Sequence, residues 1–167
     1  MPEIVAVLKH PRCIFALYVV MTIGASLAKY LSGVAFFDHT AYTHINNFII
    51  IKTAFFNLIS NQDLYTLHLD KYWDFYKYSP TFALLMAPIA AMPDILGLIV
   101  WNVLNALALY VAIAALPVHS PDTKSAMHWF LLLPLLTSVQ NAQSNGLVAA
   151  LLIGAFNCFE KLSLIHI

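Results

Sequence analysis

The sequence predicts an all-α polytopic membrane protein. Hydrophobic residues make up 61% of the 167 residues and charged residues only 10%, whereas a soluble domain usually carries about 25% charged residues. The apolar residues fall into about five hydrophobic segments separated by polar stretches. The formal net charge is zero, so no basic field favours nucleic acid. We therefore expect membrane lipids, and not nucleic acid, among the partners.

The first hydrophobic segment runs from Cys13 to about Leu31. As a helix it would rise about 28 Å, close to the thickness of a bilayer core. A cleavable signal peptide is the alternative, because basic residues precede the segment and Gly24-Ala25-Ser26 resembles a cleavage region. The segment is longer than a typical signal core and more segments follow, so we favour a signal anchor. Lys9 and Arg12 then place the N-terminus in the cytoplasm, although Lys29 at the far end opposes this.

Residues 32–79 differ in character, because they hold seven of the sixteen formally charged residues together with many aromatic ones. This stretch is too charged for lipid and too aromatic for a disordered linker. Its histidines, His39, His44 and His68, lack the spacing of a helical zinc motif. We therefore read them as interface residues and expect no metal site.

Within this stretch, Asn46 to Ile59 reads as a helix with one narrow polar stripe. The stripe consists of Asn46, Thr53, Asn57 and Ser60. We expect the helix to lie at the membrane surface with its broad apolar face in the acyl boundary. An ordinary transmembrane span is the alternative, but Lys52 near the middle and the short length disfavour it.

The chain turns apolar again after Ser79-Pro80. We expect one segment over 81–92, a break at Pro93-Asp94 and a second segment over 95–116. A hydrophilic loop over 117–125 should follow.

Two further apolar segments, 127–136 and 147–159, flank a polar patch over 138–145. Amides are costly at membrane depth unless they face a cavity or another helix. The patch is therefore either a tight turn outside the bilayer or a broken helix that lines a site. Cys13 and Cys158 lie in apolar segments, where we expect small core residues and not a disulfide.

The last six residues, 162–167, are expected to be foreign to the protein. Their sequence, LSLIHI, is the translation of the end sequence of a common sequencing transposon, CTG TCT CTT ATA CAC ATC. We therefore expect residues 1–161 to be the N-terminal part of a longer transmembrane domain, and residues 162–167 to be an adapter-derived tail.

Three stretches together carry a family resemblance. They are NNFIIIKTAFFNLISNQDLY (46–65), YKYSPTFALLMAPIAAMP (76–93) and LTSVQNAQSNGLVAALLIGAF (136–156). In this order the chain resembles the family-87 glycosyltransferases of the GT-C membrane fold. That family has an Asp-led surface helix ending in Gly-x-Asp-Leu-Tyr, then Tyr-x-Pro-Pro before an apolar run, then Gly-Gln-x-Asn.

The resemblance implies a GT-C-like transmembrane helix bundle, truncated here, with an interfacial helix in the first outer loop. It implies transfer of a sugar, mannose or another hexose, from a polyprenyl-phosphate donor to a glycan or glycolipid acceptor. The reaction would take place on the outer face of the cytoplasmic (inner) membrane, in a multi-pass protein without a cofactor. This fragment alone is expected to be inactive.

The sequence departs from the family pattern at four places. Asn47 stands where the family has its leading Asp, and asparagine cannot act as a general base. The glycine before Asp-Leu-Tyr is Asn61 or Gln62, the first proline of the pair is Ser79, and the glycine of Gly-Gln is Ala142.

Another carboxylate must therefore accept the proton of the acceptor hydroxyl if sugar is transferred. The candidates are Asp38, which is our first choice, and Asp63, Asp70 and Asp74. For each of them a solvated loop residue or a cap is the alternative. The candidate substrate-binding residues are Asn47, Lys77, Tyr78, Gln143 and Asn145.

Several of these residues also have a plain structural interpretation. Lys77 is either a phosphate ligand or a lysine that extends to the membrane interface. Gln143 and Asn145 either line a cavity or bond between helices. A non-enzymatic carrier or a flippase-like protein is the alternative function, but transporters more often show paired broken helices, and only one such break is visible here.

Overall fold

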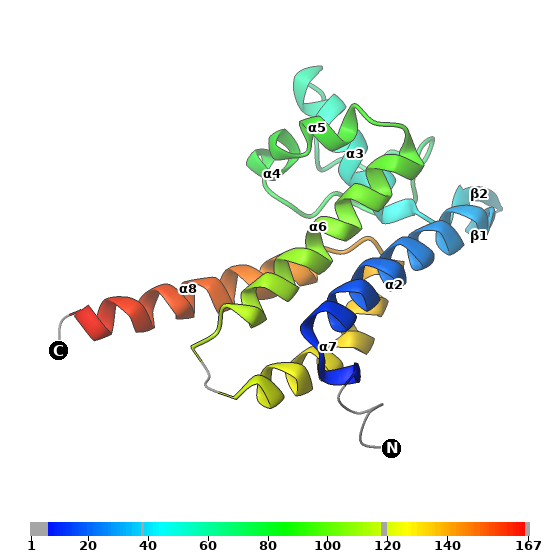
Figure 1. The fold of residues 1–167 in the computed structure, drawn as a ribbon. Coiled ribbons are helices and arrows are strands. Elements are labelled where there is room, and N and C mark those ends of the chain that lie inside the picture. Colours follow the sequence, from blue (N-terminus) through cyan, green and yellow to red (C-terminus); the bar gives the residue numbers. More distant parts are fainter. Residues whose placement is uncertain (1–6, 38, 118–119, 166–167) are drawn as a thin grey trace.

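The computed structural model describes residues 7–37, 39–117 and 120–165. Its long helices are α2 (Pro11–Leu31), α6 (Asp94–Ala114), α7 (Pro121–Gln140) and α8 (Asn145–Ile165). The first three pack side by side, and α8 packs against α6 and extends away from the others (Figure 1). Because these helices alternate in direction, residues 32–93 and 141–144 share one end of the bundle, here called the loop end. Residues 7–10, the end of α6 and the start of α7 lie at the other, terminal end.

Two of these helices, α2 and α6, are long and apolar enough to cross a membrane, among the residues that the structure describes. The first helical position of α2 is Pro11, and the His10 ring caps the backbone N–H of Arg12. Helix α6 begins at Asp94, whose negative charge suits a helix N-terminus. The expected segments 13–31 and 95–116 therefore both correspond to helices.

The helices are joined by small and amide side chains as well as by apolar packing. Asn102 of α6 donates to Ser26 Oγ of α2 at 2.9 Å and to the Val139 carbonyl of α7 at 3.1 Å. At Gly146 of α8, an added Cβ would lie 2.8 Å from the Asn105 carbonyl oxygen. This absence of a side chain lets α8 approach the α6 backbone closely. Such contacts are typical of helix packing in membranes.

The expectation of purely helical structure needs one correction, because the first loop contains an antiparallel hairpin. Its strands are β1 (Val34–Phe37) and β2 (Thr40–Thr43), with Val34 paired with Thr43. Aromatic and β-branched residues predominate in both runs, and these residue types favour extended backbone. Asp38, between the strands, lies outside the described residues.

Helix α3 (Asn46–Ile59) has the bounds that the sequence predicted. Its polar stripe, however, faces inward at two positions. Asn46 and Asn57 are buried, and Asn57 Nδ2 lies 3.2 Å from His68 Nε2 in the following loop. The stripe therefore packs beneath residues 60–79, while Phe56 and Ile59 remain exposed.

The segment expected over 81–92 is two short helices, α4 (Pro80–Leu85) and α5 (Ala87–Ala90). The break falls at Met86, just before Pro88, which has no N–H to continue the first helix. Helix α7 begins at Pro121. The prediction of a loop over 117–125 was therefore wrong for residues 121–125, which are helical. The predicted loop residues 118–119 lie outside the described residues.

Two other expectations concern single residues and the C-terminus. Cys13 and Cys158 are free, as predicted, but both are exposed on their helices and not in a core. Helix α8 extends to Ile165, and residues 166–167 of the expected foreign tail lie outside the described residues.

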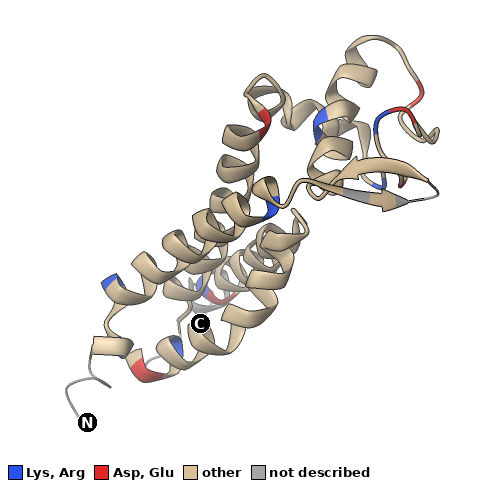
Figure 2. Cartoon of the chain, turned by 90° about the vertical axis from the view of Figure 1, so that its right-hand side faces the viewer, with Lys and Arg blue, Asp and Glu red and all other residues tan. Residues whose placement is uncertain are grey.

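Charged residues gather at the two ends of the helices, and the helix lengths between them carry almost none (Figure 2). At the terminal end Lys9 and Asp122 form an ion pair of 3.1 Å. The start of α7 therefore lies at the same end as the start of α2. At the loop end, Lys52 of α3 is 2.7 Å from Asp94 of α6, and this pair holds the first loop against the bundle.

Candidate functional site

The candidate site lies at the loop end, around a pocket of about 170 Å³. Its walls come from the first half of α3, from the loop between α3 and α4, and from the turn between α7 and α8. Five residues that the sequence singled out line it together: Asn47, Asp74, Lys77, Tyr78 and Gln143. Asp74, Lys77 and Tyr78 are close in sequence, whereas Asn47 and Gln143 are far from them, so only the fold brings these three segments together.

Asn47 forms the contact between the α3 wall and the α7–α8 turn. Its Nδ2 donates to the Asn141 carbonyl oxygen at 2.9 Å. The side-chain amide is half-buried, and it has one more N–H and an acceptor oxygen. Asn47 can therefore orient a polar ligand, but it cannot accept a proton as a carboxylate would.

Asp74 supplies a carboxylate to this pocket. Its Oδ2 is 2.7 Å from Lys77 Nζ, and its Oδ1 accepts from the Phe75 backbone N–H at 2.7 Å. Burial raises the pKa of Asp74, but the hydrogen bonds from Lys77 and Phe75 and the lysine charge outweigh it. The pKa of Asp74 therefore lies below its ordinary value, and the carboxylate is ionised at neutral pH.

The aromatic and amide residues of the site are held by their neighbours. Tyr78 stacks on Phe82 with ring centroids 4.6 Å apart, and its hydroxyl accepts from Ser144 Oγ at 3.4 Å. Gln143 Oε1 accepts from Asn145 Nδ2 at 2.9 Å. Asn145 does not line the pocket, so its part is to orient the Gln143 amide.

The turn that bears Gln143 is a helix-terminating motif. The Gln143 N–H reaches the Ser138 carbonyl at 2.9 Å, and the Ala142 N–H reaches the Val139 carbonyl at 3.1 Å. These two bonds with a left-handed residue between them form a Schellman motif. Ala142 has φ of +48°, a conformation in which glycine is unstrained and which the family pattern fills with glycine. Trp101 Nε1 fixes the turn by donating to the Ala142 carbonyl at 3.0 Å.

Helix α3 ends in the same way. Asn61 has φ of +54°, and the Gln62 N–H reaches the Asn57 carbonyl at 2.8 Å. Asn61, and not Gln62, is thus the residue whose conformation calls for glycine. Ser79, at the place of the family's first proline, caps α4 by accepting from the Phe82 N–H at 3.2 Å.

A second pocket of about 190 Å³ also has Asn47 in its wall, and Lys29, His44 and Asn46 line it. Asn46 is only 6% exposed. Its Oδ1 accepts from the Trp73 N–H at 3.2 Å, whereas its Nδ2 has no hydrogen-bond partner in the described part of the chain. None of the ion pairs between described residues involves Lys29. Donors therefore dominate this second pocket, which suits an anionic group.

The sequence did not identify Lys29 as a site residue. Lys29 entered only as evidence on which side of the membrane the N-terminus lies. The available signal was a lone lysine in the last turn of an apolar helix, at the end shared with the polar loop. Only the fold places this lysine in a pocket that also has Asn47 in its wall.

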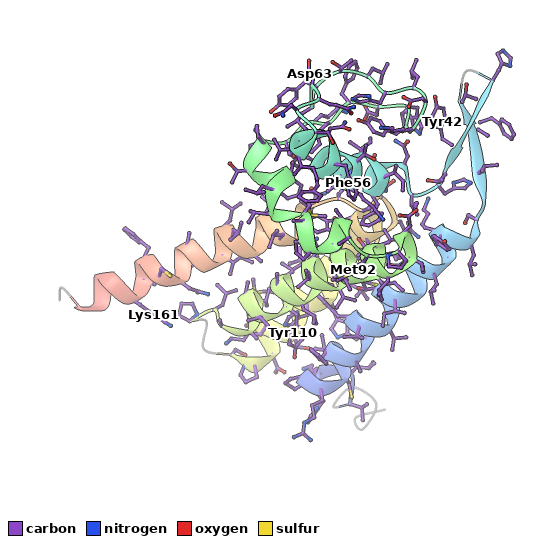
Figure 3. All side chains as sticks on the ribbon, turned by 90° about the horizontal axis from the view of Figure 1, so that it is seen from above. Tyr42, Phe56, Asp63, Met92, Tyr110 and Lys161 are labelled. Carbon is purple, nitrogen blue, oxygen red and sulfur yellow. The ribbon has the colours of Figure 1, made fainter. Side chains whose placement is uncertain are left out.

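Asp63 and Asp70 do not line either pocket. Asp63 is exposed at the outer margin of the loop end (Figure 3), and its Oδ1 accepts from the Tyr65 N–H at 2.8 Å. This backbone bond, the Thr66 hydroxyl and the nearby His68 lower the pKa of Asp63. Asp63 therefore stabilises a turn. Asp70 is exposed and does not line either pocket, and Asp38 lies outside the described residues.

The histidines take separate positions. His44 lines the second pocket, His39 has a left-handed backbone in the hairpin turn, and His68 contacts Asn57. In the described part of the chain, no three His, Cys, Asp or Glu side chains gather closely enough to hold a metal ion.

The described residues form a predominantly helical chain with two apolar helices of membrane-spanning length and a polar site at one end of them. The sequence model of glycosyltransferase family 87 matches residues 75–163. The chain belongs to this family. No curated protein and no solved structure matches the chain. The match covers two of the three stretches that carried the resemblance, while α3 with Asn47 lies before it.

Proposed function

We propose that this protein transfers a hexose such as mannose from a polyprenyl-phosphate donor to a glycan or glycolipid acceptor. The reaction takes place at the outer face of the cytoplasmic membrane, and the protein crosses that membrane several times. Membership in the family supports glycosyl transfer as the class of reaction. One observation carries the assignment of the site. Asn47 lines both the pocket that contains the Asp74 carboxylate and the second pocket, in which hydrogen-bond donors predominate.

The membrane setting is supported by the outward faces of the long helices. Large apolar side chains such as Val20, Leu133 and Leu152 are 69%, 72% and 68% exposed. Other large apolar side chains on α2, α6, α7 and α8 are exposed as well, and an extended apolar surface of this kind suits contact with lipid. Lys9 and Arg12 at the terminal end favour the cytoplasmic side for that end, which puts the loop end outside.

In the proposed reaction the acceptor hydroxyl oxygen attacks the anomeric carbon of the sugar. A new carbon–oxygen bond forms there, the bond to the phosphate oxygen breaks, and polyprenyl phosphate leaves with the electron pair. Asp74 accepts the hydroxyl proton as general base. Lys29 and the free Asn46 N–H stabilise the departing phosphate. The sugar lies between this base and the phosphate-binding residues, where Asn47, Tyr78 and Gln143 orient it.

The test is transfer of radiolabelled mannose from polyprenyl-phosphate mannose to a membrane glycolipid fraction, with the complete gene product in detergent micelles. Asp74→Asn should lower kcat by about 10²–10⁴-fold, because it removes the base and keeps the size of the side chain. Asp70→Asn is the matched control, and it should keep full activity. Full activity of Asp74→Asn would remove Asp74 from the reaction and leave Asp38 as the next candidate. No transfer by the wild type would favour the carrier function.

A measurement of donor affinity distinguishes the role of the second pocket, which has Lys29, from that of the pocket with Asp74. Lys29→Gln should weaken binding of the donor by about tenfold or more, because one charge-assisted contact to phosphate is lost. Asp74→Asn should leave donor binding nearly unchanged. Equal donor affinity in Lys29→Gln and the wild type would exclude Lys29 as a phosphate ligand.

A further inference from the structure

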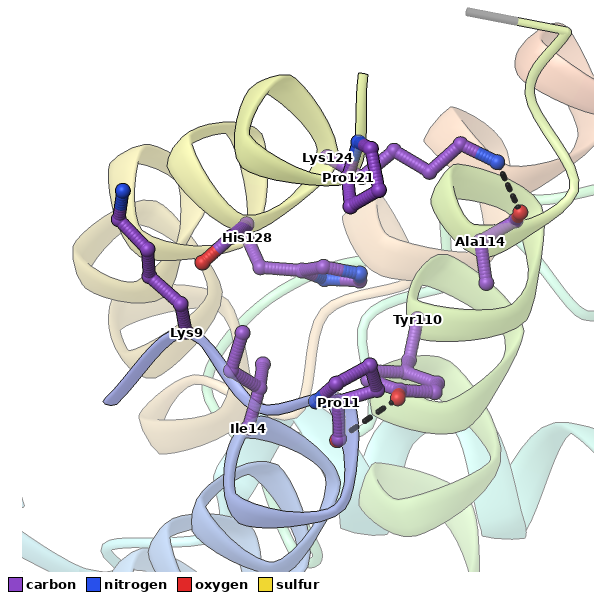
Figure 4. A pocket seen from close by; sticks show the side chains of 9 residues that line it. Lys9, Pro11, Ile14, Tyr110, Ala114, Pro121, Lys124 and His128 are labelled. Carbon is purple, nitrogen blue, oxygen red and sulfur yellow. Dashed lines mark hydrogen bonds between the residues drawn. The ribbon is translucent and has the colours of Figure 1, made fainter. Parts of the chain in front are cut away.

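A third pocket lies at the terminal end of the bundle, opposite to the proposed active site. It measures about 260 Å³ and is enclosed by the starts of α2 and α7 and the end of α6 (Figure 4). Glycosyl transfer as proposed above makes no use of this pocket. Its walls combine cationic and hydroxyl groups with apolar ones.

Two lysines stand at its edge. Lys124 Nζ donates to the Ala114 carbonyl at 2.7 Å, and Lys9 Nζ is 3.1 Å from Asp122 Oδ1. An ammonium group has three donors, so each lysine keeps N–H groups for a ligand. Because Asp122 neutralises Lys9, the excess positive charge at the edge comes from Lys124.

Ser125 is the strongest sign that something binds here. It is 5% exposed and lines the pocket, yet its Oγ has no hydrogen-bond partner in the described part of the chain. A buried hydroxyl without a partner is costly. In a helix, a serine usually avoids this cost by bonding to the carbonyl four residues before it. An acceptor from a ligand in the pocket would satisfy the Ser125 hydroxyl.

The rest of the lining is apolar or aromatic. The His128 ring lies between Pro121 and Tyr110 in the close view (Figure 4), stacked on the Tyr110 ring with centroids 4.6 Å apart. The Tyr110 hydroxyl is already bonded to the Pro11 carbonyl at 2.9 Å. Ile14 completes an apolar floor. The pocket thus offers donors on one side and a surface for hydrocarbon on the other.

We propose that this pocket binds the phosphate group of an anionic lipid. Lys124, Lys9 and the Ser125 hydroxyl bind the phosphate oxygens, and the first turn of α7 contributes its helix N-terminus. The glycerol and the start of the acyl chains lie against Ile14 and the ring pair. The pocket is at the level where α2 begins and α6 ends, which is the depth of lipid head groups if both cross the membrane. Basic pockets between membrane helices commonly bind such head groups.

The experiment measures binding of short-chain phosphatidylglycerol to the purified protein in a non-ionic detergent, by native mass spectrometry and by the shift in Tm. Diacylglycerol of the same chain length lacks the phosphate, and inorganic phosphate lacks the lipid. Phosphatidylglycerol should bind saturably and raise Tm, and diacylglycerol should do neither. Inorganic phosphate that binds alone as tightly as the lipid would keep the phosphate site but assign it to a free ion.

Two variants and one control separate the site from general charge. Ser125→Ala should raise the Tm of the lipid-free protein, because a buried unpaired hydroxyl is removed, and yet weaken lipid binding about tenfold. Lys124→Gln should weaken it by a similar factor, whereas Lys71→Gln, an exposed lysine at the loop end, should not. Wild-type affinity in both pocket variants, or equal binding of diacylglycerol, would overturn the proposal. Because this pocket lies away from Asp74, its failure would leave the proposed transfer reaction untouched.

Discussion

At the scale of single residues, the pocket of about 170 Å³ has the Asn47 amide at the position where the family pattern has a carboxylate. Asn47 and Asp74 line the same pocket from different segments. Under the proposed function, Asp74 supplies from one wall of the pocket the carboxylate that the family pattern has at position 47. Lys77 accompanies Asp74 at 2.7 Å and keeps the Asp74 carboxylate ionised.

The Asp74–Lys77 ion pair leads to a prediction about the pH dependence of kcat/KM. The pKa of Asp74 is lowered, so its ionised form persists to lower pH than in an ordinary aspartate. In Lys77→Gln the opposing effect of burial predominates, and the pKa of Asp74 rises. The acid limb of the kcat/KM profile should therefore move to higher pH in Lys77→Gln and stay in place in Lys71→Gln. An unmoved limb in Lys77→Gln would show that the ionisation seen in the profile is not that of Asp74.

A second prediction concerns Ala142, whose φ of +48° is strained for a residue with a Cβ. Ala142→Gly should stabilise the protein by about 1 kcal/mol, because glycine adopts this conformation freely. Ala106→Gly is the control, since Ala106 is equally buried but lies within α6, and it should lower Tm. Thermal unfolding in detergent measures both. A fall in Tm for Ala142→Gly would mean that the lost methyl packing exceeds the strain.

At the scale of elements, α3 is joined to the bundle by an ion pair at one corner. Lys52 Nζ contacts Asp94 Oδ1 at 2.7 Å and the Met92 carbonyl at 2.7 Å. The lysine side chain is 18% exposed and the aspartate 44%, so solvent screens the pair in part. Lys52 thus fixes the position of α3, and with it Asn47, relative to α6.

We expect a coupling energy of about 0.5–1 kcal/mol between Lys52 and Asp94. A double-mutant cycle with Lys52→Met and Asp94→Asn measures it from unfolding. Lys52→Met should cost more than Asp94→Asn, because it also leaves the Met92 carbonyl without its donor. Additive effects of the two changes would show that the pair contributes nothing to holding α3.

A comparison of the elements shows which parts of the fold could be predicted from the sequence alone. Hydrophobic length predicted α2 and α6, and spacing predicted α3 with its bounds, because both signals are local. The hairpin over 34–43 was missed, since two four-residue strands give too short a pattern. The inward direction of Asn46 and Asn57 was missed as well, because it depends on the loop that covers them.

The same division holds for the site. Asp74, Lys77 and Gln143 were identified as residue types suited to sugar phosphate chemistry, and they line one pocket. The sequence ranked Asp38 first, because four loop aspartates look alike without a fold; among the described ones, Asp74 lines this pocket. Lys29 and Ser125 needed tertiary contacts to stand out.

At the scale of the whole molecule, the alternating helices place residues 32–93 at one end, and the end of α6 and the start of α7 at the other. Single cysteines at Asp70 and Asp122 should therefore label from opposite sides of the membrane. Under the proposed orientation, a membrane-impermeant thiol reagent labels position 70 in intact cells and position 122 only in broken ones. Cys13 and Cys158 must be replaced first, because both are free and exposed. Labelling of both positions from the same side would contradict the arrangement of the helices.

The most direct test of the account asks whether the carboxylate can be moved back across the pocket. Transfer from polyprenyl-phosphate mannose is measured for Asp74→Asn, Asn47→Asp and the double variant. We predict that Asp74→Asn loses about 10²–10⁴-fold in kcat, that Asn47→Asp is tolerated, and that the double variant regains part of the activity. Restored activity would mean that positions 47 and 74 serve one reacting group. Full activity of Asp74→Asn alone would show that Asp74 is not the general base.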